Sequence, residues 1–417
     1  MPKYQAVRGM RDVLPEEAQR WQFVTMRLRE MAHRYGYGEI RTPVVEHTEV
    51  FIRAVGEGTD IVEKEMYTFT DRGGRSLTLR PEGTAAVVRA YIEHGLHTRP
   101  QPVKLYYIAE MFRYDRPQAG RYRQHTQFGA ELLGSSSPAA DVEVLSLPIR
   151  AIQSLGLREV KVHLNSVGDS RCRPPYVQRV RAYFEQFADE LDDDSRRRLV
   201  TNPLRIFDSK VERTREIARD APKMIDHLCD DCRAHFEAVL RRFQWLGIPT
   251  EVDPFIVRGL DYYTRTAAEV YSGRLGAQNA VFGGGRYDGL CELLGGPPTP
   301  GVGFGMGIER LLLVLEQEGV LPEVCWSVDV YVAARGERAQ QEAFVLLDRL
   351  RQEGLRAEGD LMDRSLSAQL RHAARLGARY AVILEDEALE RQQAVVRDLG
   401  RGEQKVVSLG RLREEIR

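Results

Sequence analysis

The residues best suited to chemistry lie at positions 258–266, in the run Arg-Gly-Leu-Asp-Tyr-Tyr-Thr-Arg-Thr. Apolar residues precede and follow this run, so its arginine and paired tyrosines fall within a predicted sheet. Burying an arginine is costly unless an anion meets it. Arg258 therefore indicates a ligand cleft that holds negative charge, and the alternative is a structural ion pair with Asp261 or Glu269.

Three further arginines would also need anions. Arg113 ends a predicted strand, Arg121 lies in a basic loop, and Arg310 opens a helix after a glycine run. A guanidinium group presents paired donors that match phosphate oxygens, so three of them converging on one sheet would suit a triphosphate. The alternative for each is an ordinary solvated arginine.

Two glycine-rich segments, 283–285 and 301–307, are predicted strands. Alternating glycines in a strand let another group approach the backbone closely. The spacing within 301–310 matches neither Gly-x-Gly-x-x-Gly nor the phosphate-binding Gly-x-x-x-x-Gly-Lys loop. The segment 283–288 could form the floor of a pocket. The alternatives are a simple turn for the first segment and close helix packing for the second.

Glu82, Gln127 and Glu131 are polar residues at strand positions with apolar or small neighbours. Gln127 and Glu131 are four residues apart, so both point to one face of a strand. Carboxylates turned inward near a cleft would bind a cation, either an amino group or a metal ion. The alternative is that these side chains face solvent.

The elements that must position these residues come as strands in hairpin order between helices. This order predicts an α+β core with a mostly antiparallel sheet rather than a doubly wound one. The predicted elements are a helix over 15–35, a short strand over 39–43, a hairpin of 66–70 and 76–80, a helix through 88–92 that Thr84 caps, and strands over 103–112 and 122–133.

Composition and rhythm divide the chain into two predicted domains, 1–325 and 326–417. The first is interrupted over 167–248 by a charge-dense, mostly helical insertion. Pro322 marks the boundary, and beyond it strands alternate with helices, which predicts a small α/β domain with parallel crossovers. Its predicted elements are strands over 328–332, 355–358 and 380–384 and helices over 337–353 and 365–376.

Bulk composition limits the class of protein. The net charge of −1 argues against a globally basic nucleic-acid binder, so any such contact must come from a local patch. No stretch approaches the roughly 20 apolar residues of a membrane helix, and the N-terminus lacks a signal core, so we expect a cytoplasmic protein without a membrane partner. The odd number of cysteines, five, indicates reduced thiols.

The pair Cys229-Asp-Asp-Cys232, with His227 and His235 nearby, raises the possibility of a zinc or redox site. There is no second Cys-x-x-Cys, and a redox pair would want a βαβ context. A plain helix in the insertion is the preferred interpretation, and no metal is assigned to protein side chains.

Four arginines of the last domain follow one another at spacings of seven, four and four, which places them on one helical face or its extension. Such a stripe could meet nucleic-acid phosphates, and a solvated face is the alternative. They are Arg364, Arg371, Arg375 and Arg379.

Taken together, these segments resemble the histidyl-tRNA synthetases, members of the class II aminoacyl-tRNA synthetases. Positions 258–263 (Arg-Gly-Leu-Asp-Tyr-Tyr) resemble the family's histidine-specific signature. Three segments of this sequence resemble the three motifs of the class. They are the helix and strand ending at Pro43, the segment from Phe112 to Gln124, and the run 301–310. The segments 80–84, 202–210 and 283–290 are also similar to the family. The end of the chain resembles the class's anticodon-binding domain, notably at 363–370 and 376–384.

The resemblance implies a site for ATP. Arg113 would hold the α-phosphate, Arg310 the γ-phosphate, and Arg121 would assist from a loop that also faces the acceptor end of the tRNA. Mg²⁺ would bridge the phosphates. His125 stands where the family usually has a phenylalanine that stacks on adenine, and an imidazole can stack with less apolar area.

The resemblance also implies a site for L-histidine. Glu131 and the Tyr262–Tyr263 pair would line the imidazole pocket, and Arg258, with Arg113, would be catalytic by neutralising charge between the histidine carboxylate and the α-phosphate. The residues implied for the α-ammonium end are Glu82, Gly83, Thr84 and Gln127.

The implied activity is that of a histidine–tRNA ligase, working as a homodimer on histidine tRNA. Histidine and ATP would form histidyl-adenylate, and the tRNA 3′ end would take the histidyl group, with Arg364, Arg371 and Arg375 as candidate tRNA contacts. The alternative is a synthetase-like regulatory subunit that senses histidine for its biosynthesis without charging tRNA. Another class II synthetase would share the last domain but would not explain positions 258–263.

Overall fold

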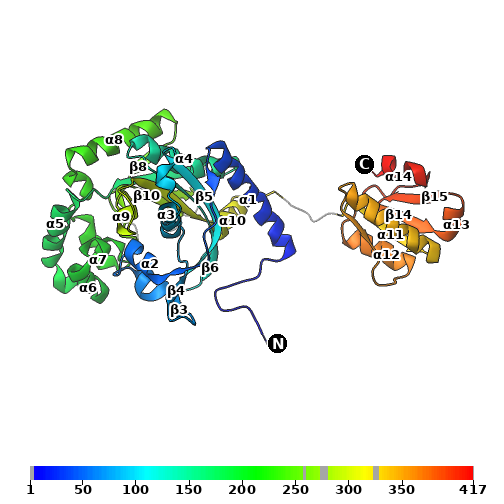
Figure 1. Cartoon of the computed structure of the whole chain (residues 1–417), viewed down its shortest axis with the longest axis horizontal. Helices are drawn as coiled ribbons and strands as arrows, with labels where there is room; N and C mark the ends of the chain where they lie inside the picture. Colours follow the sequence, from blue (N-terminus) through cyan, green and yellow to red (C-terminus); the bar gives the residue numbers. More distant parts are fainter. Residues whose placement is uncertain (1–3, 257–259, 273–279, 323–327, 417) are drawn as a thin grey trace. The chain divides into compact units, whose positions relative to one another are not determined.

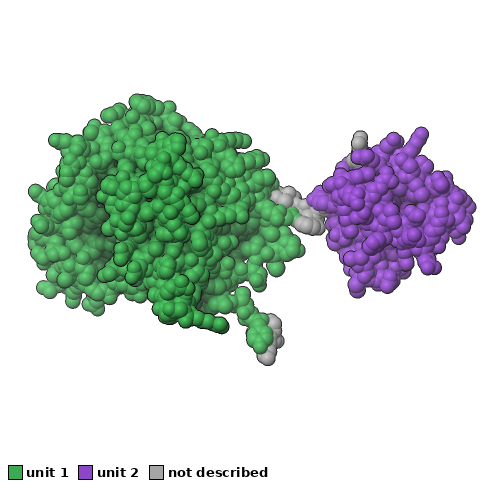
Figure 2. Space-filling view, in the orientation of Figure 1, with its two compact units in different colours: residues 1–322 green, residues 323–417 purple. Residues whose placement is uncertain are grey.

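The computed structural model describes residues 4–256, 260–272, 280–322 and 328–416. The chain forms two compact units, Met1–Pro322 and Glu323–Arg417 (Figures 1 and 2). Each unit has its own sheet and its own hydrophobic core. Among the described residues, no helix has the length and apolar character needed to cross a membrane.

The first unit is built on an eight-stranded sheet in the order β1-β5-β6-β11-β10-β9-β7-β8. Neighbours from β5 to β7 run antiparallel, and the outer pairs β1–β5 and β7–β8 are parallel. The prediction of a mostly antiparallel α+β core is therefore confirmed. The strands are β1 (Gly38–Glu39), β5 (Val103–Phe112), β6 (Gln124–Leu133), β7 (Val160–Ser166), β8 (Thr250–Val252), β9 (Thr264–Ser272), β10 (Ala280–Arg286) and β11 (Gly301–Gly307).

Helices α1 (Pro15–Arg34), α4 (Pro138–Ser154), α8 (Asp230–Trp245) and α10 (Ile308–Gln317) share one core with the central strands. The predicted helix over 15–35 is confirmed as α1, which buries Val24 and Leu28 at its periodic positions. Its end is followed by Gly36, whose φ of 77° suits a residue without a Cβ. The predicted strand over 39–43 is wrong in extent, because only Gly38–Glu39 pairs with β5.

A second cluster of apolar side chains joins α2 (Thr48–Val55), α3 (Thr84–Glu93) and α9 (Leu290–Leu293). Beside it lies a small antiparallel sheet with the order β2-β4-β3. The predicted hairpin is confirmed in this sheet. Its strands are β2 (Val45–His47), β3 (Tyr67–Thr70) and β4 (Ser76–Leu79).

Between β7 and β8 the chain is helical. Helices α5 (Arg173–Glu185), α6 (Asp193–Thr201) and α7 (Glu212–Arg219) contribute to a separate apolar cluster, and α8 runs from it back into the main core. Short helical turns of the first unit are Ile61–Glu65, Leu96–Thr98, Ala188–Glu190, Pro203–Asp208 and Met224–His227.

The glycine-rich segment 283–285 lies inside β10, so the alternative of a simple turn is wrong. β10 ends at Arg286, which is fully buried and forms ion pairs with Asp141 of α4 and with Asp288. His235 of α8 contacts the same Asp141 carboxylate at 3.2 Å. Burial alone would raise the pKa of Asp141, but His235 and Arg286 hold that pKa below its ordinary value. This network fastens β10 to two helices, so the glycine strand has a fixed position.

The second unit has a five-stranded sheet in the order β13-β12-β14-β15-β16. The predicted parallel strands are present, but β15 and β16 form an antiparallel hairpin that the sequence analysis did not assign. The strands are β12 (Val330–Arg335), β13 (Ala357–Gly359), β14 (Tyr380–Glu385), β15 (Gln393–Asp398) and β16 (Gln404–Ser408). The helices are α11 (Glu337–Gln352), α12 (Leu366–Arg375), α13 (Asp386–Glu390) and α14 (Leu412–Glu415), with a turn at Leu409–Arg411.

Candidate active site

A buried carboxylate lies at the centre of the candidate site. Glu131 of β6 has no exposed surface and accepts hydrogen bonds from three hydroxyl groups. Thr84 Oγ1 donates to Oε1 at 2.8 Å, Tyr107 donates to the same oxygen at 3.4 Å, and Tyr287 donates to Oε2. We call these four residues, with Tyr262, the Glu131 pocket. Gln127, four residues earlier, also turns toward β11, as predicted from the spacing.

The Glu131 pocket lacks a positive charge of its own among the described residues, because no lysine, arginine or histidine there pairs with Glu131. Burial raises the pKa of Glu131 to about 8, although the three hydroxyl donors oppose that rise. A buried carboxylate with only neutral partners favours a ligand that brings a cation or shares a proton.

A second buried carboxylate, Glu82, lies at the start of α3. Its oxygens accept the backbone N–H groups of Thr84 and Ala85 at 2.7 and 2.8 Å. Glu82 therefore caps the helix, and the prediction that Thr84 does so is wrong, because the Thr84 hydroxyl is used by Glu131. Burial raises the pKa of Glu82 despite these bonds.

The alternating glycines of β11 leave room for the polar side chains of the neighbouring strands. A Cβ at Gly303 would overlap Glu131 Oε2, and a Cβ at Gly305 would overlap Gln127 Nε2. The predicted close approach is thus confirmed, and the approaching groups are side chains of this chain. Gln127 Oε1 is buried without a hydrogen-bond partner among the described residues. This oxygen can therefore accept a hydrogen bond from a ligand.

The paired tyrosines complete the Glu131 pocket. Tyr262 and Tyr263 are both buried, with ring centroids 4.8 Å apart, and the Tyr262 ring meets that of Tyr287 edge to face at 5.7 Å. Burial raises the pKa of Tyr262 well above its ordinary value, so its hydroxyl stays protonated. Arg258, the predicted catalytic residue, lies outside the described residues.

We expect the substitution Gly305→Ala to raise the KM for the pocket's ligand about tenfold, because the new methyl group displaces the Gln127 amide and removes one hydrogen bond to a charged group. The fold should survive, since the atom in the way is the end of a flexible side chain. Steady-state kinetics measure the change. The control is Gly289→Ala, whose Cβ meets no atom within 4 Å. Equal KM values in the two variants would contradict this role for Gln127.

A cleft of about 790 Å³ contains all four residues predicted to bind a nucleotide. We call it the arginine cleft, after Arg113, Arg121 and Arg310, and its fourth predicted member is His125. Its volume is in the range of small-molecule sites. Gly283 and Gly305 also line it, which places the glycine strands at its surface.

The charges in the arginine cleft favour an anion. Burial, and then the neighbouring charge of Arg121, lower the pKa of Arg310. Burial together with Arg113 lowers the pKa of His125 to about 3, so its imidazole is neutral and can stack. Arg113 Nε donates to the Pro81 carbonyl at 2.7 Å, next to Glu82. Arg113 therefore connects the arginine cleft with the carboxylates of the neighbouring site.

The helical segment contributes cations that were not assigned as site residues. The arginine cleft is also lined by Arg198, Arg205 and Lys210, which come from the helical segment between β7 and β8. Arg198 and Arg205 each lie 3.9 Å from Asp60. The resemblance of segment 202–210 to the family could have predicted that Arg205 and Lys210 belong to the site.

Comparison with known proteins bears on this arrangement. A family model of histidyl-tRNA synthetase matches residues 9–170 and 178–311, and a model of the anticodon-binding domain matches 329–417. The chain belongs to the histidyl-tRNA synthetase family. This result confirms the resemblance, together with the class II fold and the anticodon-binding domain.

Individual histidyl-tRNA synthetases are similar over nearly the whole chain. The histidine–tRNA ligase of Desulforamulus reducens is 52% identical over 405 residues, covering 97% of each protein. That of Desulforudis audaxviator is 53% identical over 413 residues, covering 98% of this chain and 97% of the relative. The crystal structure of apo histidyl-tRNA synthetase from S. aureus matches with a TM-score of 0.84 and 40% identity over 99% of each chain.

In this member of the histidyl-tRNA synthetase family, the described residues predicted for the nucleotide and the amino acid fall into two adjoining places. Tyr107 and Tyr287 were missed, although both hydroxyls contact Glu131. Tyr287 stood within the glycine-rich motif at 283–290. Tyr107 gave no signal, because a tyrosine in an apolar strand is usually core.

The arginines of the anticodon-binding domain only partly share one face. Arg371 and Arg375 are exposed on α12, and neither pairs with an acidic group among the described residues. Arg364 precedes the helix and pairs with Asp360 at 2.8 Å, so its prediction as part of a helical stripe is wrong. Ser365 is the N-cap of α12 and has an extended backbone, so Arg364 lies before the helix.

Proposed function

We propose that the chain is a histidine–tRNA ligase that converts L-histidine and ATP into histidyl-adenylate and pyrophosphate, then transfers histidine to the 3′ end of its tRNA. The observation that carries the proposal is the junction of a buried carboxylate pocket with a cleft of arginines, connected through Arg113. An amino acid with a basic ring suits the pocket, and a triphosphate suits the cleft.

For histidine, we assign the imidazole to Glu131 with Tyr262 and Tyr263. The α-ammonium group is assigned to Glu82, Thr84 and Gln127, where Gly83 allows the backbone to pass closely: a Cβ at that position would overlap Tyr107. The unpartnered Gln127 oxygen supports this orientation. Side chains without a basic ring would leave Glu131 with only its neutral hydroxyl partners, so the pocket discriminates through its buried polar groups.

For ATP, we assign the α-phosphate to Arg113 and the γ-phosphate to Arg310, with Arg121 assisting and His125 facing the adenine. Mg²⁺ would neutralise phosphate charge when bound. Its fit rests on Glu269, a carboxylate that lines the arginine cleft and offers the oxygen ligand this ion prefers.

The chemistry follows from positioning and charge. A histidine carboxylate oxygen attacks the α-phosphorus of ATP, a P–O bond forms, and the bond to the pyrophosphate oxygen breaks. Arg113 holds the charge that develops on the α-phosphate, and we assign Arg258 to the same task. The 3′-terminal adenosine of the tRNA then displaces AMP from the adenylate. No covalent enzyme intermediate is needed.

We also propose that the enzyme is a cytoplasmic homodimer and that its second unit contacts the tRNA. Arg371 and Arg375 are candidate phosphate contacts, because both are exposed on α12. Arg364 is a weaker candidate, since Asp360 already balances its charge. The dimer is supported by exposed apolar residues near the predicted first class motif, including Val44 and Val45.

The rival function, a histidine-sensing regulatory subunit without tRNA charging, is less supported. The relatives that are about 50% identical over their full length are histidine–tRNA ligases. The chain also has the arginine cleft, and its residues 329–417 match the anticodon-binding domain.

The test is histidine-dependent exchange of labelled pyrophosphate into ATP. We expect exchange that requires both histidine and Mg²⁺ and that no other amino acid supports. Histidine binding without any exchange would overturn the proposal in favour of the sensor. Charging of histidine tRNA, measured on the same preparation, tests the second step.

A further inference from the structure

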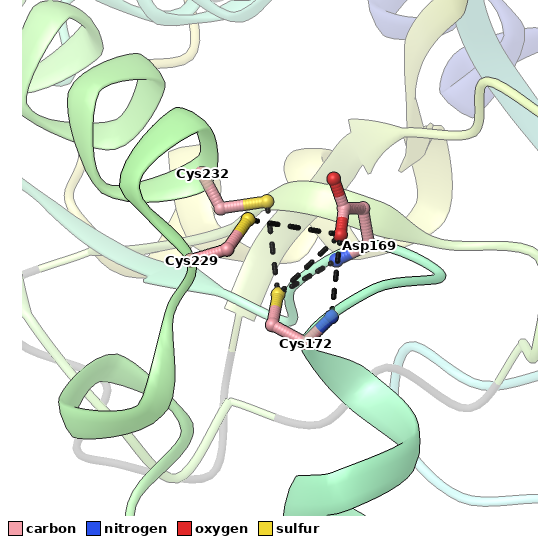
Figure 3. Close-up of side chains that lie close together, drawn as sticks. All are labelled: Asp169, Cys172, Cys229 and Cys232. Atoms are coloured by element: carbon pink, nitrogen blue, oxygen red, sulfur yellow. Dashed lines mark hydrogen bonds between the residues drawn. The ribbon is translucent and has the colours of Figure 1, made fainter.

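Three cysteines and one aspartate that are far apart in the sequence meet in space (Figure 3). Asp169 and Cys172 lie in the loop between β7 and α5, whereas Cys229 and Cys232 lie at the start of α8. Their four potential ligand atoms all lie within 4.8 Å of one another. We call these residues the Cys₃Asp cluster. It plays no part in the proposed chemistry of histidine and ATP.

Three distances within the cluster are close to those of tetrahedral coordination. The sulfurs of Cys172 and Cys232 are 3.8 Å apart, and Asp169 Oδ1 lies 3.5 Å from Cys172 Sγ and 3.9 Å from Cys229 Sγ. A tetrahedral zinc ion with Zn–S bonds of about 2.3 Å and a Zn–O bond of about 2.0 Å places sulfurs about 3.8 Å apart and a sulfur and an oxygen about 3.5 Å apart.

We propose that the Cys₃Asp cluster is a structural zinc site, with three thiolates and one Asp169 oxygen as ligands. Thiolates select zinc over Mg²⁺ or Ca²⁺, which prefer oxygen. Four protein ligands leave no open position, which is typical of structural rather than catalytic zinc. The two Asp-x-x-Cys and Cys-x-x-Cys pairs also have the two-residue spacing that zinc sites commonly use.

Two arginines offset part of the charge of the site. Three thiolates and a carboxylate around a divalent ion leave two negative charges. Arg171 contacts Asp169 Oδ2 at 2.9 Å and Asp231 at 2.7 Å, and Arg265 lies 3.8 Å from the same Asp169 oxygen, so the two arginines offset part of the negative charge of the ligand set. They bind the oxygen that faces away from the sulfurs, while Oδ1 remains directed at Cys172 and Cys229. Such partners orient metal ligands.

The site would tie the helical segment to the sheet beside the Glu131 pocket. The Val167 N–H donates to the Arg265 carbonyl and the Arg265 N–H to the Gly168 carbonyl, both at 2.7 Å. Arg173, next to Cys172, donates to the carbonyl of Tyr263 at 3.0 Å. Zinc at this position would therefore fix the loop that leads into α5. The first residue of α5, Arg173, holds the Tyr263 carbonyl.

The first test is the metal content of the full-length protein, purified with a thiol reductant and analysed by inductively coupled plasma mass spectrometry. We expect about one zinc ion per chain, lost in Cys229→Ser and Cys232→Ser. The matched control is Cys291→Ser, a buried cysteine outside the cluster, which should keep the zinc. Replacing zinc by cobalt should give the sulfur-to-cobalt charge-transfer band and the intense visible bands of a tetrahedral thiolate site.

The alternative for the same residues is a disulfide between Cys172 and Cys232. It would appear as a loss of two hydrogen masses in the intact protein without reductant and as two fewer titratable thiols. That result, or metal-free protein that also takes up no zinc or cobalt when titrated under reducing conditions, would overturn the proposal. These readouts do not depend on aminoacylation, so they separate failure of the zinc site from failure of the proposed function.

Discussion

Replacing Arg113 by alanine is expected to lower the rate of histidine-dependent pyrophosphate exchange about 10³-fold. Arg113 lines the arginine cleft and is fixed by its hydrogen bond to the Pro81 carbonyl, so its guanidinium is held in place before substrates arrive. Removing one such preorganised donor to a developing charge costs about 10²- to 10³-fold in rate, and Arg113 also carries a full charge. The loss should fall on kcat more than on the KM for histidine.

The control for this substitution is Arg241→Ala, which removes an exposed arginine of α8 that does not line the arginine cleft. It should keep the exchange rate of the natural chain. Circular dichroism and the melting temperature check that both variants fold. If Arg113→Ala retained more than about a tenth of the exchange rate, the assignment of the α-phosphate to this arginine would be wrong.

Replacing Glu131 by glutamine is expected to raise the KM for histidine about 100-fold, because a charge-assisted hydrogen bond in a buried pocket becomes a neutral one. Glutamine keeps the size of the side chain, but its single amide oxygen can accept either from Thr84 and Tyr107 or from Tyr287. The KM for ATP should change little. Isothermal titration calorimetry with histidine alone measures the loss directly, without the later steps.

The pH dependence of histidine binding gives a sharper test of Glu131. The free pocket carries a proton below pH about 8, whereas a histidine imidazole loses its proton near pH 6.5. In the complex the two groups share one proton. Between these pH values the pocket supplies it, so affinity should be highest there. Affinity should fall at lower pH, where a proton must leave, and at higher pH, where one must be taken up.

In Glu131→Gln the fall above pH 8 should disappear, while titration of the ligand's own ammonium group affects both proteins equally. An unchanged upper limb in the variant would rule out Glu131 as the titrating group. Folding stability offers a second check. A pKa raised above its ordinary 4.5 contributes stability that is present below pH 4.5 and lost as pH rises through about 8. The ligand-free variant should therefore match or exceed the natural chain in melting temperature above pH 8.

Much of this fold could be predicted from periodicity, since α1 and β5 repeat their apolar residues over long segments. The β15–β16 hairpin could not be predicted in the same way, because both strands carry charged residues and β16 is an exposed edge strand. The cap of α3 was assigned to Thr84 by residue preference alone. Tertiary structure overrode that preference, because the threonine hydroxyl bonds to a carboxylate 47 residues later.

The candidate site was predictable where spacing within one strand decides the outcome. Gln127 and Glu131 share a face because they are four residues apart on β6. The Cys₃Asp cluster was not predictable, because its two halves are separated by about 60 residues and meet only through packing of the helical segment. Arg258 lies outside the described residues, and its role remains a prediction from resemblance.

The alternating glycines of β11 have a consequence for engineering and for evolution. The glycines of β11 have no side chains, so the backbone of this strand sets the depth of the amino-acid pocket. Any larger residue at Gly303 or Gly305 displaces a functional group, so this wall offers few routes to gradual change. A variant that accepts a bulkier histidine analogue should be sought by substituting smaller residues for Tyr262, Tyr263 or Tyr287. Such substitutions remove a ring and leave the sheet in place.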